Sequence, residues 1–159
     1  MKKQTNQNTI DIINTLKNRD QTITFAESCT GGRIASAFTA ISGASSVLMG
    51  SAVTYANEIK SEWLDVKEET LIKYGAVSSE CIEEMLTGIL KMASADYAIA
   101  VSGIAGPTGG TEEKPVGTVY IGVKNREKSM VQRHLFKGKR EEIQKEATKS
   151  AIALLKNIL

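Results

Sequence analysis

Residues 97–101, with the sequence YAIAV, form a short apolar run without a charged side chain. A run of this length is typical of a central β-strand whose two faces are both covered by other elements. Such a strand requires a helical layer on each side of its sheet, because an uncovered face would leave apolar side chains in water. The chain has 159 residues, of which 42% are hydrophobic and 24% are charged, as expected of one globular domain with a sizeable core.

Predicted strands and helices alternate along the rest of the chain. Alternating or β-branched segments predict strands at 22–26, 50–55, 97–101, 116–123 and 129–136. Apolar residues at helical spacing predict helices at 5–17, around 34–38, at 57–64, 67–74 and 79–93, and from Arg140 onwards. The polar turn at 125–128 joins the last two strands as an antiparallel pair. We therefore predict one domain, 1–159, of the α/β class: a three-layer α/β/α sandwich with a mixed parallel/antiparallel sheet.

Charge and composition narrow the range of partners. The net charge of +2 predicts no strongly basic surface, so no nucleic-acid partner is expected. The apolar runs are too short to cross a bilayer, and no apolar segment follows the two lysines near the start, so neither a membrane partner nor a secretory signal is expected. Two cysteines do not suggest a disulfide framework, which favours a reducing, cytoplasmic compartment.

The residue types restrict the chemistry of an active site. The single histidine, His134, lies in a predicted strand, where a surface or edge position is the simple interpretation. Cys29 and Cys81 are far apart and have no ligand spacing, so no metal site is predicted. A Ser-His-Asp triad would need His134. Without it a hydrolase needs another base, and a lysine can serve where desolvation or a neighbouring cation lowers its pKa.

Ser28 is the candidate nucleophile. It ends a predicted strand and precedes Thr30, Gly31 and Gly32 at a helix start, where free N–H groups favour a negative oxygen or a phosphate. A plain helix cap by Ser28 and Thr30 explains the same pattern equally well. Cys29 is a rival nucleophile. The alternation of side chains in an extended segment points it away from Ser28, however, and we expect it to be a small buried cysteine of the core.

Other polar features follow the remaining predicted strands. Tyr55 and Lys60 come after the second strand, where a strand-end aromatic and a solvated lysine would also account for them. The glycine-rich loop at 103–110 lacks the lysine of a Walker A motif. A strand follows it instead of a helix, so it does not fit a dinucleotide fingerprint. Its glycines still permit close approach of a ligand to the backbone. Arg140 starts the last helix, where either a bound phosphate or plain exposure would explain it.

Several long motifs occur together in one order. They are AESCTGG at 26–32, VTYANEIK at 53–60, YGAVS at 74–78, SGIAGPTGG at 102–110 and EKPVGTV at 113–119. In these motifs and their order, the chain resembles the CinA C-terminal domain family from about Thr22 to the C-terminus. Two small departures are Ala56, where a serine is common, and Glu112, where a proline is common.

The resemblance implies an activity and a set of residues. It implies hydrolysis of the carboxamide of nicotinamide mononucleotide (NMN) to nicotinic acid mononucleotide and ammonia in pyridine nucleotide salvage, without a metal or other cofactor. It implies Ser28 as nucleophile and Lys60 as its base, with Tyr55 and Ser45 nearby. We expect Tyr55 to take part in catalysis, by relaying a proton or by orienting Lys60. We expect the oxyanion at the helix start formed by Thr30, Gly31 and Gly32. The residues expected to bind the substrate are Ser45, Ser102, Gly103, Gly106, Thr108, Gly109 and Arg140.

Other functions remain open from the sequence. The runner-up is a non-catalytic nucleotide-binding or regulatory module, in line with the family's links to competence and DNA damage. A third alternative is hydrolysis of another small amide, or of a pyrophosphate, in the same pocket. The family resemblance also implies a homodimer or a higher homo-oligomer.

Overall fold

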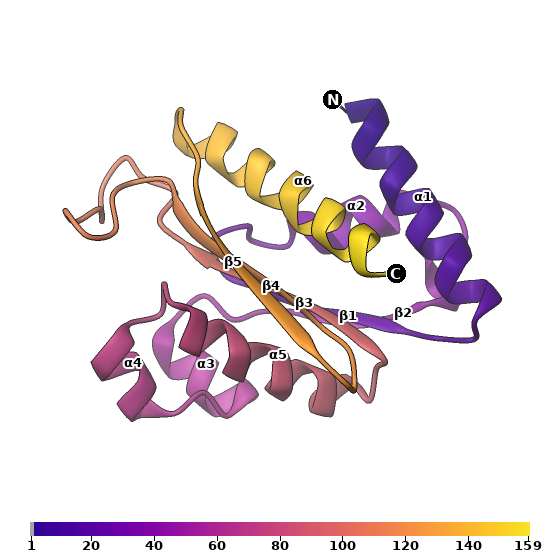
Figure 1. Cartoon of the computed structure of the whole chain (residues 1–159), viewed down its shortest axis with the longest axis horizontal. Helices are drawn as coiled ribbons and strands as arrows, with labels where there is room; N and C mark the ends of the chain where they lie inside the picture. Colours follow the sequence, from indigo (N-terminus) through magenta and orange to yellow (C-terminus); the bar gives the residue numbers. More distant parts are fainter. Residues whose placement is uncertain (1) are drawn as a thin grey trace.

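The computed structural model describes residues 2–159 as a five-stranded sheet with helices on both faces (Figure 1). The elements in chain order are α1 (Lys2–Asn18), β1 (Ile23–Glu27), α2 (Arg33–Thr39), the 3-10 helix η1 (Ala44–Ser46), β2 (Leu48–Val53), α3 (Asn57–Leu64), α4 (Glu68–Tyr74), α5 (Ser79–Ala93), β3 (Tyr97–Gly103), β4 (Thr118–Lys124), β5 (Ser129–Leu135) and α6 (Arg140–Ile158). The predicted three-layer α/β/α fold is confirmed.

The sheet is mixed, with the strand order β2-β1-β3-β4-β5. β1 pairs in parallel with β2 and with β3, whereas β4 is antiparallel to both β3 and β5. All five predicted strands differ from the observed strands by one or two residues at an end. β4 begins at Thr118, because Gly117 turns the chain at φ +96° and donates its N–H to the Ile104 carbonyl. β2 ends at Val53, before Thr54 and Tyr55 turn towards α3.

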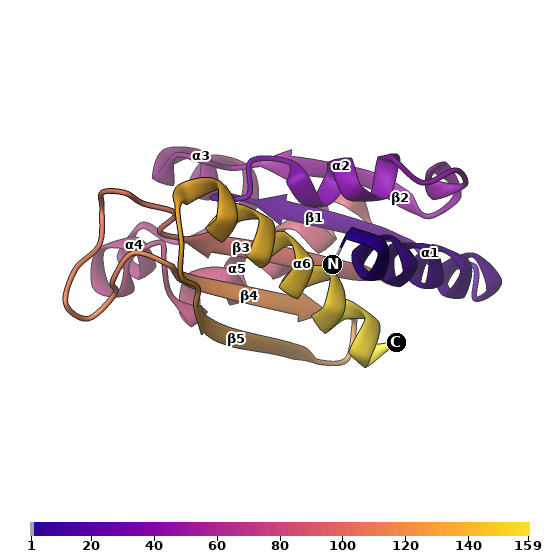
Figure 2. The same ribbon diagram turned by 90° about the horizontal axis from the view of Figure 1, so that it is seen from above.

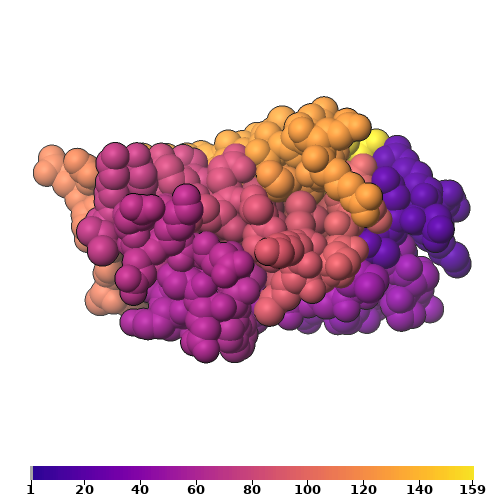
Figure 3. Space-filling view, turned by 90° about the horizontal axis from the view of Figure 1, so that it is seen from below, coloured from indigo at the N-terminus to yellow at the C-terminus, as the bar shows by residue number. Residues whose placement is uncertain are grey.

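Helices cover the two faces in separate groups (Figures 1 and 2). α1, α2 and α6 lie on one face, where Phe25 of β1 packs against Phe38 of α2 with ring centroids 4.8 Å apart. α3, α4 and α5 lie on the other, where Ala26 of β1 joins a core with Ile82 and Leu86 of α5. Figure 3 shows this second face, with the segment that contains α3–α5 spread across it.

β3 is buried from Tyr97 to Ser102, which confirms the central strand predicted from its apolar run. β1 is also fully buried, and its side chains alternate between the two layers. Phe25 belongs to the core on the α2 side and Ala26 to the core on the α5 side. Continued alternation sends Glu27 towards α2 and Ser28 towards α3, and this placement determines the chemistry at the end of the strand.

Candidate active site

A pocket of about 200 Å³ lies at the carboxyl ends of β1 and β3. It is lined by Ser28, Cys29, Tyr55, Asn57, Lys60, Ala76, Val77, Ser102, Gly103, Ala105 and Arg140. β1, the β2–α3 link, α3, the α4–α5 link, β3 and the start of α6 all contribute to it. It therefore occupies the edge of the sheet where ligands bind in most open α/β folds.

The Ser28 hydroxyl and the Lys60 amine form a direct, buried hydrogen bond. Lys60 Nζ lies 3.1 Å from Ser28 Oγ. Ser28 is only 7% exposed and Lys60 only 1% exposed. Lys60 is in the first half of α3, so its side chain crosses from that helix to the strand end. The structure thus brings together the two residues that the sequence places 32 positions apart.

Two backbone carbonyls orient the Lys60 amine. Nζ donates to the Thr54 carbonyl at 2.8 Å and to the Tyr55 carbonyl at 2.9 Å. Carbonyls only accept, so these contacts occupy two N–H groups and leave the third tetrahedral position of Nζ directed at Ser28. In a neutral amine this position is the lone pair, and Ser28 then donates its proton to it. The arrangement can therefore take a proton from the serine hydroxyl.

Burial is the main cause that alters the protonation of Lys60. Desolvation lowers the pKa of this amine below its ordinary 10.5, and the nearby thiols Cys81 and Cys29 oppose the change more weakly. A lowered pKa increases the fraction of neutral amine near pH 7, which a base requires. The sequence analysis required either desolvation or a neighbouring cation, and the structure provides desolvation.

Arg140 and Tyr55 form a second polar group at the pocket. Arg140 donates from Nη1 to the Gly106 carbonyl at 2.7 Å and from Nη2 to the Tyr55 hydroxyl at 3.1 Å. The Tyr55 side chain is 60% exposed, so its hydroxyl lies at the mouth of the site and its carbonyl holds Lys60. Gly106 takes part through its carbonyl, whereas Ser102 and Gly103 line the pocket directly.

The N–H groups of the first turn of α2 itself are already occupied, so the expectation that they are free is wrong. The Glu27 carboxylate accepts from the N–H groups of Ile34 at 2.9 Å and Ala35 at 3.0 Å, and from the Thr30 hydroxyl at 2.7 Å. The Gly31 N–H donates to the Ser28 carbonyl at 3.0 Å. Within residues 2–159, the N–H groups of Cys29, Thr30 and Gly32 donate to no backbone carbonyl outside the regular elements, so an oxyanion contact from Thr30 or Gly32 stays a prediction. The signal that sequence reasoning missed is an acidic residue directly before the turn.

Cys29 and His134 occupy the structural positions predicted for them. Cys29 belongs to the core on the α2 side, and desolvation raises the pKa of its thiol to about 12. A thiol with that pKa stays protonated near neutral pH, so Cys29 is a poor nucleophile. His134 lies on the edge strand β5 and stacks on Phe136, with ring centroids 5.0 Å apart. Burial lowers the pKa of His134.

Four residues expected to bind substrate, Ser45, Gly106, Thr108 and Gly109, do not line this pocket, although the Gly106 carbonyl holds Arg140. Ser45 lies in η1, before β2, and the pairing of Ile23 with Leu48 places that end of β2 beside the start of β1. Ser45 is thus at the opposite end of the sheet from Ser28, so the expectation that it lies nearby is wrong within this chain. Thr108 and Gly109 are exposed in the loop after β3 and are absent from the pocket lining.

Four lining residues were not among the predicted site residues. Asn57 begins α3, Ala76 and Val77 lie between α4 and α5, and Ala105 follows β3. Each lies within a motif of the sequence analysis, yet the small apolar side chains of Ala76, Val77 and Ala105 carry no chemical signal of their own, and Asn57 at the start of a predicted helix is read as an ordinary helix-start residue. Their position in the fold, rather than their residue type, brings them to the pocket.

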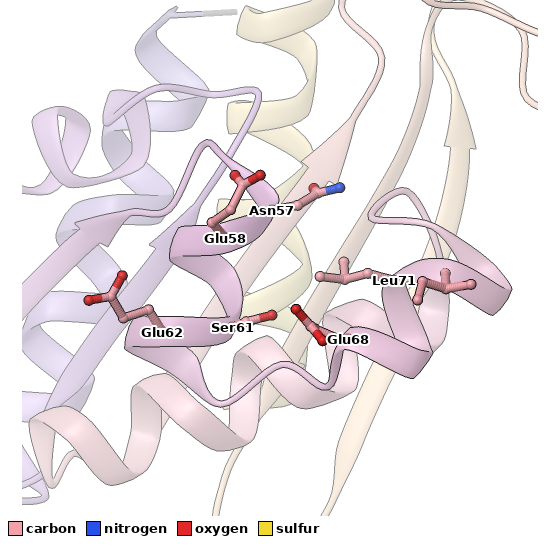
Figure 4. A pocket seen from close by; sticks show the side chains of 7 residues that line it. Asn57, Glu58, Ser61, Glu62, Glu68 and Leu71 are labelled. Atoms are coloured by element: carbon pink, nitrogen blue, oxygen red, sulfur yellow. The ribbon is translucent and has the colours of Figure 1, made fainter.

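A larger hollow of about 570 Å³ lies between α3 and α4 (Figure 4). It is lined by Asn57, Glu58, Ser61, Glu62, Glu68, Leu71 and Ile72. Its three carboxylates would repel a phosphate, and its lining contains no base paired with a nucleophile. We therefore assign the candidate active site to the smaller pocket around Ser28. Within residues 2–159, no group of three or more metal-ligating side chains is present, and no helix is both long and apolar enough to cross a bilayer.

The fold and the pocket define an α/β/α protein with a buried serine–lysine pair at the carboxyl ends of its central strands. The sequence profile of the CinA C-terminal domain matches residues 5–159, so the chain belongs to this family.

Individual relatives agree with this assignment. A CinA-like protein of Endomicrobium trichonymphae is 50% identical over 139 residues, which are 87% of this chain and 32% of that protein. The chain thus spans about a third of the length of this relative. Nicotinamide-nucleotide amidohydrolase PncC of Escherichia coli (strain K12) is 48% identical over 141 residues, which are 88% of this chain and 86% of PncC. The crystal structure of competence/damage inducible protein CihA from Agrobacterium tumefaciens is 38% identical and superposes with a TM-score of 0.93, covering 95% of this chain and 93% of CihA.

Proposed function

We propose that the chain is a nicotinamide-nucleotide amidohydrolase that converts NMN and water into nicotinic acid mononucleotide and ammonia, a step of pyridine nucleotide salvage. The observation that carries this proposal is the buried hydrogen bond between Lys60 Nζ and Ser28 Oγ at 3.1 Å. The similarity to PncC over most of the length of both chains supports the choice of substrate.

In the first half of the reaction, Ser28 Oγ attacks the carboxamide carbon while neutral Lys60 takes the hydroxyl proton. A tetrahedral intermediate forms with a negative charge on the former carbonyl oxygen. The Cys29 N–H directly follows the nucleophile and donates to no backbone carbonyl among residues 2–159, so it is the donor we assign to this oxygen. The C–N bond then breaks, and protonated Lys60 returns its proton to the departing ammonia.

In the second half, water attacks the resulting ester of Ser28. Lys60, neutral again, takes a proton from this water and returns it to Ser28 Oγ as the ester bond breaks. The carbonyls of Thr54 and Tyr55 keep the amine directed at Ser28 through both halves. No step requires a metal or a redox cofactor, because the only covalent change is acyl transfer from nitrogen to oxygen.

The mouth of the pocket is suited to the nucleotide part of the substrate. Arg140 brings a positive charge there, and its hydrogen bonds to Tyr55 and Gly106 hold the guanidinium in place. We assign Arg140 to the phosphate of NMN, since a guanidinium matches phosphate geometry. Ser102 and Gly103 line the pocket next to the reacting group. Binding through the phosphate predicts that free nicotinamide is a poor substrate.

The deciding experiment measures ammonia release from NMN by the purified protein, with and without a chelator. Wild-type protein is expected to release ammonia in both conditions, and Ser28→Ala is expected to release none while keeping its fold. Binding of NMN without ammonia release would favour the alternative, a nucleotide-binding or regulatory module. Full activity of folded Ser28→Ala would end the proposed mechanism.

A further inference from the structure

A buried carboxylate lies directly behind the candidate nucleophile. Glu27 precedes Ser28, is 0% exposed, and points to the opposite face of the sheet. Its Oε1 accepts from the Thr30 hydroxyl at 2.7 Å and from the Ile34 N–H at 2.9 Å, and its Oε2 accepts from the Ala35 N–H at 3.0 Å. The mechanism proposed above does not use this group.

No cation balances this carboxylate. Among residues 2–159, the salt bridges involve other acidic residues. Three neutral donors and the positive end of α2 therefore stabilise the Glu27 charge. These contacts join the end of β1 to the start of α2 across residues 28–32, the segment that contains the nucleophile. Its conformation depends on a charge held inside the protein.

Backbone hydrogen bonds also connect Glu27 to the base, Lys60. The Thr54 N–H donates to the Glu27 carbonyl at 2.9 Å, and the Thr54 carbonyl accepts from Lys60 Nζ at 2.8 Å. On the other side, the Ser28 N–H donates to the Val101 carbonyl at 3.0 Å. Glu27 thus contacts both parts of the site. Its carboxylate holds the turn after β1, and its carbonyl holds Thr54, whose own carbonyl binds Lys60.

We propose that Glu27 is a positioning residue, whose carboxylate holds the turn at 28–32 so that Ser28 Oγ faces Lys60 and the Cys29 N–H remains free for the oxyanion. The inference rests on the proposed roles of Ser28 and Lys60. It also places the substrate phosphate away from the start of α2, because Glu27 already occupies the N–H groups there.

The role requires a carboxylate rather than a polar side chain of the same size. All three partners of Glu27 are donors, so every contact needs an acceptor oxygen. A glutamine in its place would direct its NH₂ group either at the Ala35 N–H or, in the other orientation, at the Ile34 N–H, so one backbone contact would become repulsive. The turn would then shift although the side-chain volume is unchanged.

The main test compares Glu27→Gln with Glu84→Gln. Glu84 is a matched control, because its carboxylate also accepts from one backbone N–H, that of Lys67, and from one threonine hydroxyl, that of Thr70, at the α4–α5 contact. For ammonia release from NMN, we expect kcat to fall about 10–100-fold in Glu27→Gln with KM within about threefold. We expect Glu84→Gln to keep the wild-type kcat at a similar loss of melting temperature. A wild-type kcat in Glu27→Gln, or equal losses in both variants, overturns the inference.

Chemical rescue separates positioning from plain stability. In Glu27→Ala, added formate can replace the missing carboxylate beside Thr30, Ile34 and Ala35, and we expect it to raise kcat without changing that of Glu27→Gln. If Glu27→Ala does not fold, Thr30→Val and Thr30→Ser replace it. The first loses the hydroxyl that donates to Glu27 and should lose kcat, whereas the second keeps it and should keep kcat. Equal kcat in the two Thr30 variants overturns the inference.

A probe that needs no natural substrate keeps this test apart from the test of the function. The rate at which a fluorophosphonate modifies Ser28 should fall in Glu27→Gln and stay at the wild-type value in Glu84→Gln. An unchanged rate in Glu27→Gln overturns the positioning role, whatever the activity on NMN. Wild-type protein that is modified at Ser28 but releases no ammonia from NMN refutes the proposed substrate, and the slower modification of Glu27→Gln still supports the inference.

Discussion

Replacing Lys60 by methionine should abolish turnover while leaving the fold intact. Methionine keeps an unbranched apolar stem as far as Cε in place of the lysine side chain, which is 1% exposed, but it lacks the terminal amine and so has no proton acceptor for Ser28. Loss of a general base costs about 10²–10⁴ in rate, which is about 2.7–5.4 kcal/mol in the activation barrier at 1.36 kcal/mol for each tenfold. We therefore expect kcat to fall by this factor.

The stability of Lys60→Met should reflect a loss and a gain that partly cancel. The carbonyls of Thr54 and Tyr55 lose their donor, at a cost of about 1–3 kcal/mol each if they stay dry. Removing a buried amine recovers the desolvation penalty that lowers its pKa, which offsets part of that cost. Urea unfolding of the wild type and of Lys60→Met measures the difference, with exposed Lys91→Met as the control for loss of a lysine.

The pH dependence of stability and of kcat/KM tests the role of Lys60 in a second way. The folded state disfavours protonated Lys60, so the wild type should gain stability as pH rises from the lowered pKa towards 10.5, and the gain should be complete above 10.5. The wild-type kcat/KM should rise with pH through that lowered pKa. Lys60→Met should lack this contribution to stability. A folded Lys60→Met within tenfold of the wild-type kcat, or with the same pH profile, would refute Lys60 as the base.

Three further substitutions test the site and its frame. Arg140→Met should raise KM for NMN more than it lowers kcat, because the guanidinium lies at the pocket mouth with Tyr55. Steady-state kinetics with NMN measure both constants, and an unchanged KM would argue against a phosphate contact. Cys29→Ala should keep kcat within about threefold and lose about 1–2 kcal/mol of stability, since a thiol with a pKa of about 12 packs in the core and does not act as a nucleophile. Loss of turnover in the folded variant would contradict this. Gly117→Ala should lower the free energy of unfolding by more than about 2 kcal/mol, because its φ is +96° and a Cβ would lie 1.9 Å from the Phe136 carbonyl oxygen. Urea denaturation measures this loss, and a stability equal to that of the wild type would contradict the prediction.

The sequence was sufficient to predict most of the fold, because its elements differ in hydrophobic period. The helices at 57–64 and 79–93 have the predicted bounds, and the run at 97–101 is the buried central strand. Ser28, with Cys29 turned away from it, followed from the alternation of side chains along β1. Among the strand ends that differ, those at Thr118 and Val53 depend on turn contacts to residues distant in the sequence.

The parts of the site that were wrong depend on information that residue type does not contain. Ser45 came from the family resemblance alone, and only the register of β2 against β1 shows that it lies at the far end of the sheet. The start of α2 has the sequence of an open anion site, yet Glu27 closes it from the preceding strand. A buried glutamate and a solvated one have the same letter, so three-dimensional placement was needed to distinguish them.

The Ser28–Lys60 pair was expected from the family resemblance, and in the structure two short connections determine its geometry. The β2–α3 link supplies both carbonyls that hold Lys60, from residues five and six positions before it. The pairing of Glu27 with Val53, extended by the bond from the Thr54 N–H to the Glu27 carbonyl, then sets that link beside the end of β1. A lysine base needs both a dry environment and a fixed direction. Here the same three residues of backbone, 54–56, connect the strand to the helix that carries the base and contribute both acceptors, so a change in the length of this link should disrupt the amine's burial and its direction together.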